Sequence, residues 1–262
     1  MSTYNPRTNR RPLHAEQGFT LVELMVTVAI ALFLIGGLLT VLQNVRGAYN
    51  NQQALSQLQD QQRFAMTVLT DVIQAGGYFP DPKNWQPVTS LPATGNYALG
   101  QAFWGNHPSA NGPDTIGIRY RTALNDGVIF CDGSSNTTQD PTGLFVSQFT
   151  VVPPAGNTPG QLQCQLTDGA TGANINGPVP IVNGVQNLLI YYGVKRNAVP
   201  VDYNVDTYLT ADQMTAADWN NISSVRVILT FNNPLYKGTA DQPQLIQFER
   251  VIEVMSRAGV HT

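Results

Sequence analysis

The chain has 262 residues, of which 42% are hydrophobic and only 12% are charged, and its formal net charge is −3 at pH 7. This weakly acidic balance argues against a general phosphate-binding surface, so no specific nucleic-acid binding is expected. The low charge content, with 23 Gly and 17 Pro, is typical of an exported, loop-rich β domain. It argues against a cytosolic helical enzyme.

A short polar leader opens the chain, carries Arg7, Arg10 and Arg11, and ends at Gly18. The apolar run that follows has no charged residue over residues 24–42. At about 1.5 Å per helical residue, the run is long enough to cross a hydrocarbon core of roughly 30 Å. Arginines before a span predict that the N-terminus stays cytoplasmic and that the bulk of the chain is translocated.

The apolar run begins with GFTLVE, from Gly18 to Glu23. A carboxylate at this depth in a membrane is costly unless something neutralises it. An ordinary secretory signal places small residues after its apolar region and loses that region on cleavage, which does not fit this order. The alternatives are a plain signal anchor with a chance GFTLVE, and a membrane glutamate on an ion path. The second needs partner helices that a single-span chain lacks.

The leader and GFTLVE together resemble the class III signal of type IV prepilins. The resemblance implies that a prepilin peptidase cuts after Gly18, that the new terminal residue Phe19 is N-methylated, and that Glu23 becomes the fifth residue of the mature chain. In a filament, the carboxylate of an incoming subunit can then meet the Phe19 amine of its neighbour, and both charges lose their desolvation penalty together. Glu23 is therefore expected to set the registration between subunits.

The helical period continues past the apolar run while the apolar face narrows to one stripe. Gly76 and Gly77 supply a C-terminal stop, and two prolines soon afterwards prevent the helix from resuming. We therefore expect one helix over residues 19–76, membrane-spanning over 19–42 and amphipathic in its second half. The stripe and its flanking residues are Leu55, Leu58, Ala65, Met66, Leu69, Val72 and Ile73.

Residues 77–262 read as one β-rich domain on the periplasmic or pilus-surface side of the leader (1–18) and helix. Residues 78–112 have no sustained period and are expected to be loop. Short β-branched or aromatic runs between turn signals then predict strands. The fold class is α+β: a pilin-like long helix packed on an antiparallel sheet. The expected strands are 115–121, 127–131, 143–151, 161–166, 185–194, 223–231 and 245–255.

Two cysteines, Cys131 and Cys164, both follow the span. An even number in an oxidising compartment predicts one disulfide. Closing the loop between the two cysteines with a disulfide would stabilise the fold by roughly 3–4 kcal/mol in the chain-entropy model. A metal pair or a reactive thiol is the alternative, but neither has His or Cys neighbours in the sequence to support it.

Signals for catalysis are sparse. A nucleophile–base pair would have to use His107, while Ser134 and Ser135 have the context of turn residues. No nucleophile elbow, zinc-protease helix motif or phosphate-binding loop occurs. Aromatic residues gather in the loop region and either cover the sheet or stack on sugars or bases. They are Tyr78, Phe79, Trp85, Tyr97, Phe103 and Trp104.

Calcium is the one cofactor that the sequence suggests. Asp202, Asn204 and Asp206 imitate positions 1, 3 and 5 of a calcium loop. The sixth position is Thr207, where glycine would be needed for the sharp turn, and the twelfth is Gln213 rather than Glu. A solvated acidic loop is therefore the preferred interpretation, with calcium as the alternative, and no cofactor or metal site is expected.

The segment LSQLQDQQRFAMTVLTDVIQAGGY, residues 55–78, resembles the PilW family of minor pilins, as do residues 185–194 and 219–231. That resemblance implies a structural, non-enzymatic subunit of a type IV pilus, in a tip complex that primes assembly and so supports twitching motility, adhesion or DNA uptake. The implied partners are other minor pilins and the major pilin through the helix, prepilin peptidase, and a tip adhesin. The protein would lie in the inner membrane before assembly and in the pilus afterwards.

Two other classes of protein remain open at this point. A type II secretion pseudopilin of the GspJ kind shares the signal and the helix-plus-sheet plan. A membrane-anchored periplasmic enzyme or lectin would need an acid–base pair or a sugar site within residues 79–184. Lys195, Arg196 and Asn197 stand where PilW relatives often have an acidic, glycine-rich loop, so this part of the chain departs from the family pattern.

We predict that Gly18→Val leaves the leader attached and prevents assembly. Glycine has no Cβ, so a peptidase can approach its backbone closely, and a branched side chain should block that approach. Mass spectrometry of the N-terminus measures the outcome. A mature Phe19 end in the variant would contradict the prediction.

Overall fold

The computed structural model describes residues 18–108, 112–137, 143–156, 158–197, 204–238 and 242–256. The leader arginines and Asp202 lie outside these residues. The chain divides between Gln52 and Gln53 into two compact units, which are described separately below.

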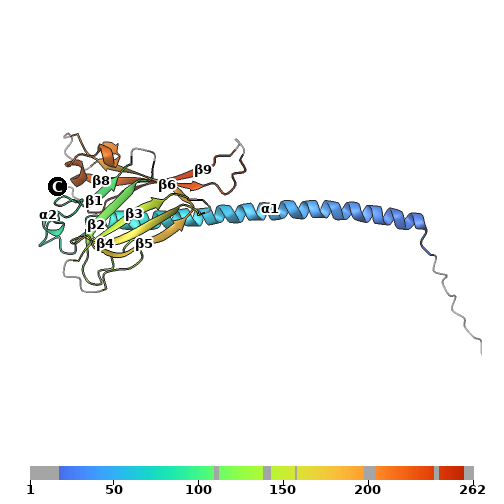
Figure 1. Ribbon diagram of the computed structural model, residues 1–262, viewed down its shortest axis with the longest axis horizontal. Helices are drawn as coiled ribbons and strands as arrows, with labels where there is room; N and C mark the ends of the chain where they lie inside the picture. Colours follow the sequence, from blue (N-terminus) through green and yellow to red (C-terminus); the bar gives the residue numbers. More distant parts are fainter. Residues whose placement is uncertain are drawn as a thin grey trace, which may run out of the picture. The chain divides into compact units, whose positions relative to one another are not determined.

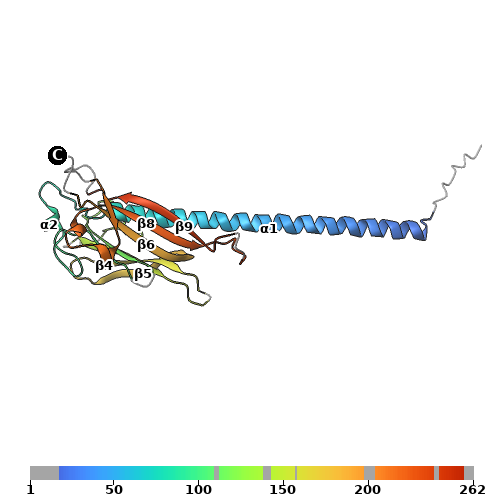
Figure 2. The same ribbon diagram turned by 90° about the horizontal axis from the view of Figure 1, so that it is seen from above.

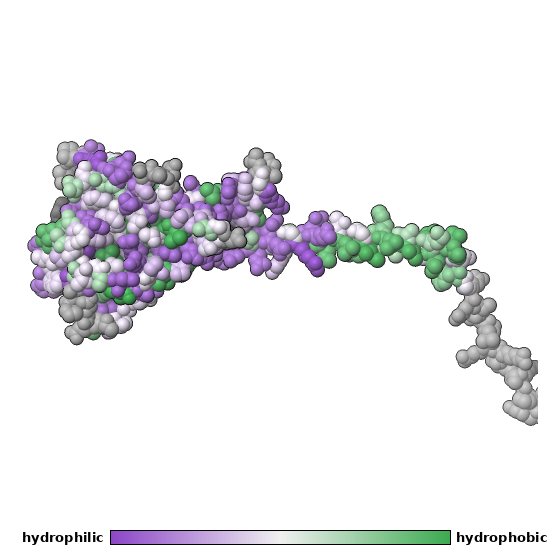
Figure 3. Space-filling view, viewed as in Figure 1, coloured by the Kyte–Doolittle hydropathy of each residue, from purple (hydrophilic) through white to green (hydrophobic). Residues whose placement is uncertain are grey.

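Helix α1 runs from Leu21 to Gln74 and extends through both units. In the first unit, every described residue is exposed, and most of them up to Val45 are apolar. Figure 3 shows this run as an almost continuous hydrophobic surface. Among the described residues, helix α1 is the one helix that is long and apolar enough to cross a membrane. Because a helix satisfies its backbone groups internally, it suits a segment without access to water.

In the second unit, the last part of α1 is amphipathic. The predicted stripe is the buried face: Ala65, Met66, Leu69 and Ile73 are fully enclosed. The helix ends at the predicted glycine pair. Gly77 has a positive φ of 77°, and its N–H donates to the carbonyl of Arg119 at 2.9 Å. A Cβ at Gly76 would collide with the Phe103 ring. Both glycines are therefore required by local geometry.

Two antiparallel sheets form the rest of the second unit (Figures 1 and 2). The first has the order β1-β2-β3-β4-β5, so its neighbours in sequence are also neighbours in space. The second has the order β7-β6-β8-β9. The strands are β1 Phe103–Asn106, β2 Thr115–Arg121, β3 Leu144–Val152, β4 Gln161–Asp168, β5 Asn174–Asn183, β6 Val185–Val194, β7 Thr207–Leu209, β8 Ile222–Asn232 and β9 Leu245–Glu253.

One hydrophobic core joins the two sheets to the end of α1. Strand β8 shows how the sequence pattern produces it: Val225, Val227, Leu229 and Phe231 are fully buried, while Arg226 is partly exposed between them. The helix-plus-sheet plan predicted from the sequence is therefore the architecture observed. Short helical turns complete it: α2 Pro87–Ser90, and the 3₁₀ turns Ala211–Gln213 and Asp218–Asn220.

The strand predicted at residues 127–131 and the loop predicted over residues 78–112 were both wrong in part. Residues 127–131 form no named strand, and Ile129 makes only an isolated bridge with Ser135. The Asp126 carboxylate instead accepts the N–H groups of Ala123 (2.8 Å) and Val128 (3.2 Å), which closes a turn that competes with a strand. Within the expected loop 78–112, strand β1 pairs with β2 from Phe103 to Asn106.

The two cysteines form a disulfide, Cys131–Cys164, with their Cα atoms 5.9 Å apart. Cys164 lies in the middle of β4, and Cys131 lies in a turn-rich segment that follows β2. Both residues are buried in the core. The bond therefore ties the segment without a strand partner to the centre of the first sheet.

We predict that purified oxidised protein has no titratable thiol, and that the double variant Cys131→Ala/Cys164→Ala is less stable by about 3–4 kcal/mol. For a domain of this size that loss lowers the melting temperature by roughly 10 °C. Thiol titration under denaturing conditions and thermal melting measure the two effects. Free thiols in protein purified without reductant, or an unchanged melting temperature, would overturn the role given to this bond.

Candidate assembly site

The start of α1 has a specific cap. The Thr20 hydroxyl accepts the N–H of Glu23 at 3.3 Å, and the Thr20 carbonyl accepts the N–H of Leu24 at 3.1 Å. Thr20 is thus the N-cap, and Glu23 stands at the third helical position. The order Thr-x-x-Glu is the sequence of a capping box. This signal was legible in GFTLVE, and it gives Thr20 a role that the sequence analysis did not assign.

Glu23 lies in the first turn, where the partial positive charge of the helix N-terminus favours a carboxylate. Phe19, just before the cap, has 79% of its surface exposed. A cut after Gly18 would place a new α-amino group four residues from Glu23. One carboxylate, a capped helix end and an exposed aromatic residue therefore lie together at the start of the apolar surface.

A side chain at Gly18 would meet no steric obstacle among the described residues, because a Cβ built at this position has nothing within 4 Å. Gly18, Phe19 and Thr20 also precede the helix. Within the described part of the chain, no contact therefore calls for glycine at this position.

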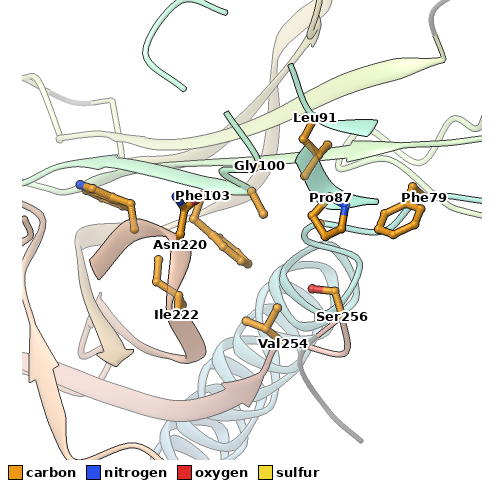
Figure 4. A pocket seen from close by; sticks show the side chains of 12 residues that line it. Phe79, Pro87, Leu91, Gly100, Phe103, Asn220, Ile222, Val254 and Ser256 are labelled. Carbon is orange, nitrogen blue, oxygen red and sulfur yellow. The ribbon is translucent and has the colours of Figure 1, made fainter. Parts of the chain in front are cut away.

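Beside the C-terminal end of α1, the β domain has a pocket of about 320 Å³ (Figure 4). Its wall is mostly apolar, with Phe79, Phe103, Ile222 and Val254 facing the space and Ser256 among the few polar groups. None of its described lining residues is ionisable. The pocket can therefore hold an apolar group, but its own lining offers no acid or base for catalysis.

A buried arginine holds one side of this pocket. The Arg119 guanidinium donates to the carbonyls of Pro92 (2.6 Å), Ala98 (3.1 Å) and Gln101 (Nε, 3.0 Å), and lies 4.6 Å from the centre of the Tyr97 ring. Burial lowers its pKa to about 10. These bonds fold the segment that carries two lining residues, Leu91 and Gly100. Arg119 therefore has a structural role, because it holds several backbone carbonyls of this segment together.

His107 has a carboxylate partner but no nucleophile. Its Nδ1 lies 2.7 Å from Oδ1 of the buried Asp114, whose Oδ2 accepts the N–H of Ile190 at 2.7 Å. Burial raises the pKa of Asp114, although the Ile190 N–H and His107 act in the opposite direction. Among the described residues, no hydrogen bond joins His107 to a hydroxyl or a thiol. The Ser134 hydroxyl donates instead to Asp132 at 2.6 Å, within a turn.

The described part of the suggested calcium loop is used by the protein itself. The Asp206 carboxylate accepts the N–H groups of Asn197 (2.7 Å) and Arg196 (3.1 Å) and the hydroxyl of Thr207 (2.8 Å). The two backbone bonds lower its pKa. Within the described residues, no group of three or more His, Cys, Asp or Glu side chains could hold a metal ion. Calcium stays the untested alternative to a solvated loop, because it depends on Asp202, which lies outside the described residues.

The loop aromatics mostly contribute to packing. Phe103 belongs to the core, Tyr97 stacks with Arg119, and Trp85 lies 5.0 Å from the Arg121 guanidinium. Trp85 is also among the exposed large side chains. Sugar or base stacking by these residues stays a prediction.

Comparison with known families gives two matches. Residues 13–39 match the prokaryotic N-terminal methylation motif, and residues 148–256 match the family described as type IV pilus-assembly protein W. The first covers Gly18, Phe19 and Glu23. The second runs from β3 to just beyond β9, so it covers residues 185–194 and 219–231 but not residues 55–78, where the sequence also resembles this family. It matches a pilus family rather than a secretion pseudopilin.

A similar solved structure is a type IV-like pilin from Thermus thermophilus. It is 14% identical, with a TM-score of 0.38, and the alignment covers 75% of this chain and 95% of that chain. At this level of similarity it carries no weight beside the two family matches. No curated protein sequence matches this chain.

We predict that Thr20→Val weakens the start of α1 by about 1 kcal/mol, because the isosteric side chain cannot accept the Glu23 N–H. Amide exchange at Glu23, followed by NMR in detergent micelles, should accelerate by roughly fivefold. Thr20→Ser should keep the cap. Thr27→Val is the matched control, since the Thr27 hydroxyl only donates to the Leu24 carbonyl at 2.9 Å within the helix. Equal exchange rates in Thr20→Val and wild type would refute the capping role.

Proposed function

Since this chain is a type IV pilus minor pilin of the PilW family, we propose that it belongs to the complex that primes pilus assembly and remains at the pilus tip. Its contribution is structural, as in pilins generally. In this role it supports twitching motility, adhesion or DNA uptake through the filament and catalyses no reaction itself.

The observation that carries the proposal is the exposed apolar surface of α1 with a single carboxylate near its start. Burying such a surface gains about 25 cal/mol per Å², so it must be covered by lipid or by other helices. Both environments are used in turn by a subunit that waits in the inner membrane and then joins a filament. The helix therefore also supplies the contacts with other minor pilins and with the major pilin.

Glu23 explains how such a transfer can be specific. Lipid and helix surfaces are both apolar, so apolar area alone does not fix the axial position of an incoming subunit. A carboxylate that must find a neighbour's Phe19 amine does fix it, because an unpaired charge in an apolar environment is costly. We infer that prepilin peptidase cuts after Gly18 and that Phe19 is then N-methylated, which creates this amine.

The topology follows from the leader. Its arginines keep the N-terminus cytoplasmic, and the β domain is translocated to the periplasm. After assembly, the β domain lies on the surface of the pilus, where it could also contact a tip adhesin.

We predict that Glu23→Ala is cleaved and stays in the inner membrane but enters pili at least about tenfold less often. Removing the charge makes membrane insertion no harder, while an axial registration worth a few kcal/mol is lost. The ratio of this subunit to the major pilin in sheared pili measures the effect.

Asp60→Ala is the matched control, because Asp60 is an exposed carboxylate on the same helix but outside the apolar run. It should enter pili at the wild-type ratio. If Glu23→Ala does so too, the pairing of Glu23 with Phe19 is wrong for this subunit.

A further inference from the structure

The two sheets have four edge strands, and three of them are protected against pairing with another chain. Strands β1 and β7 are short, with 4 and 3 residues. Strand β5 contains Pro178 and Pro180, and its pairing with β4 has several register shifts. Short length, proline and bulges are the usual means by which proteins block an open sheet edge.

The fourth edge, β9, has none of these protections. It has 9 residues, contains no proline, and pairs with β8 without a register shift from Leu245 to Glu253. Figure 2 shows β9 at the margin of its sheet. A long, regular, open edge is a template for one more strand.

The hydrogen bonds at the two ends of the β8–β9 pair identify the groups that point outward. The Val254 N–H donates to the Ser223 carbonyl at 3.0 Å, and the Asn233 N–H donates to the Gln244 carbonyl at 2.9 Å. Hydrogen-bonded and non-hydrogen-bonded residue pairs alternate along an antiparallel ladder. The backbone N–H and C=O groups of the even-numbered residues of β9 therefore point toward β8. The outward N–H and C=O groups belong to Leu245, Gln247, Glu249, Val251 and Glu253. No hydrogen bond to these backbone groups is found within the part of the chain that the structure describes.

The side chains of β9 define what could pair there. On the face turned away from the core, Leu245 and Val251 have 44% and 51% of their surfaces exposed. Glu249 is paired with Arg226 at 2.7 Å, and Glu253 has no ion pair among the described residues. Cross-strand neighbours stabilise a sheet when apolar residues meet apolar ones and opposite charges meet. The edge therefore fits an extended, β-branched or aliphatic segment with a lysine or arginine opposite Glu253.

A second copy of β9 fits this edge poorly. The antiparallel register that pairs all nine residues of two copies places Glu249 opposite Glu249 and Glu253 opposite Leu245. Glu253, which has no ion pair among the described residues, then meets no basic side chain of the second copy, whose charged groups on this face are also glutamates. Like charges placed directly opposite destabilise a sheet. The charge pattern thus favours a different chain.

We infer that β9 is a docking edge at which an extended segment of a different pilus subunit adds as a fifth strand to the second sheet. This inference rests on the assembly role proposed above. Main-chain hydrogen bonds to the outward groups would supply most of the attraction, and Glu253 would select a basic partner segment.

The test uses full-length protein co-expressed with each other pilin of the same pilus and solubilised from membranes. Gln247→Pro removes one outward N–H and no ladder bond to β8, whereas Gln247→Ala keeps that N–H. Co-purification of one pilin subunit should fall at least tenfold with Gln247→Pro and stay unchanged with Gln247→Ala. Wild-type co-purification of every pilin with Gln247→Pro would overturn the inference.

A photo-crosslinking residue at position 247 in otherwise unchanged protein guards against misfolding of the proline variant. It should form an adduct with a different pilin, and the same residue at Ile175 on the protected edge strand β5 should not. An adduct only with a second copy, or with no pilus subunit, would refute the docking edge. If wild-type protein enters pili while these tests fail, only the docking edge is wrong; if it never enters pili, the proposed function fails as well.

Discussion

An apolar surface of helical length that carries one carboxylate is the constraint on which the rest of this molecule depends. In water the surface would be costly, and in lipid or among helices the carboxylate would be costly, so neither environment suits the free chain completely. Helix α1 can leave water because it satisfies its own backbone groups, and it lowers the cost of the carboxylate by placing Glu23 in its first turn. In the assembly proposed above, the Phe19 amine of a neighbouring subunit would remove the remaining cost. This is the physical sense in which the chain is a subunit: its most stable state includes neighbours.

The β domain, unlike α1, supplies hydrogen-bond partners for its own charged groups. Its buried ionisable side chains bind backbone groups or other side chains of the same domain. The Arg119 guanidinium binds backbone carbonyls, and Asp114 binds His107 and the Ile190 N–H. Loops that lack apolar periodicity are thus ordered by hydrogen bonds to buried charged side chains and by one disulfide. A domain with few charged residues can in this way maintain long connections over a modest core.

Most of the fold could be predicted because the hydrophobic residues of its elements recur with a strong helical or strand period. The α1 stripe, the strands corresponding to β2, β6 and β8, and the disulfide follow from spacing and cysteine count. Strands β1, β5 and β7 were missed because each conflicts with local preference: β1 is very short, β5 contains Asn, Gly and Pro, and β7 has only three residues. Their strand conformation comes from pairing with a neighbour. In the assembly site, the resemblance pointed to Gly18, Phe19 and Glu23, while Thr20 went unassigned although Thr-x-x-Glu was visible. No sequence pattern announced the role of Arg119, because its partners are backbone carbonyls brought together by the fold.

The cap at Thr20 also has a consequence for processing. A protease binds its substrate in an extended form, and a scissile bond inside a helix could be reached only after local unwinding. Here the helix is closed by its own side chain two residues beyond Gly18, so the bond between Gly18 and Phe19 already belongs to the non-helical segment. The cut proposed above would therefore remove nothing that holds α1 together. It would leave the helix unchanged and add only the new Phe19 amine in front of it.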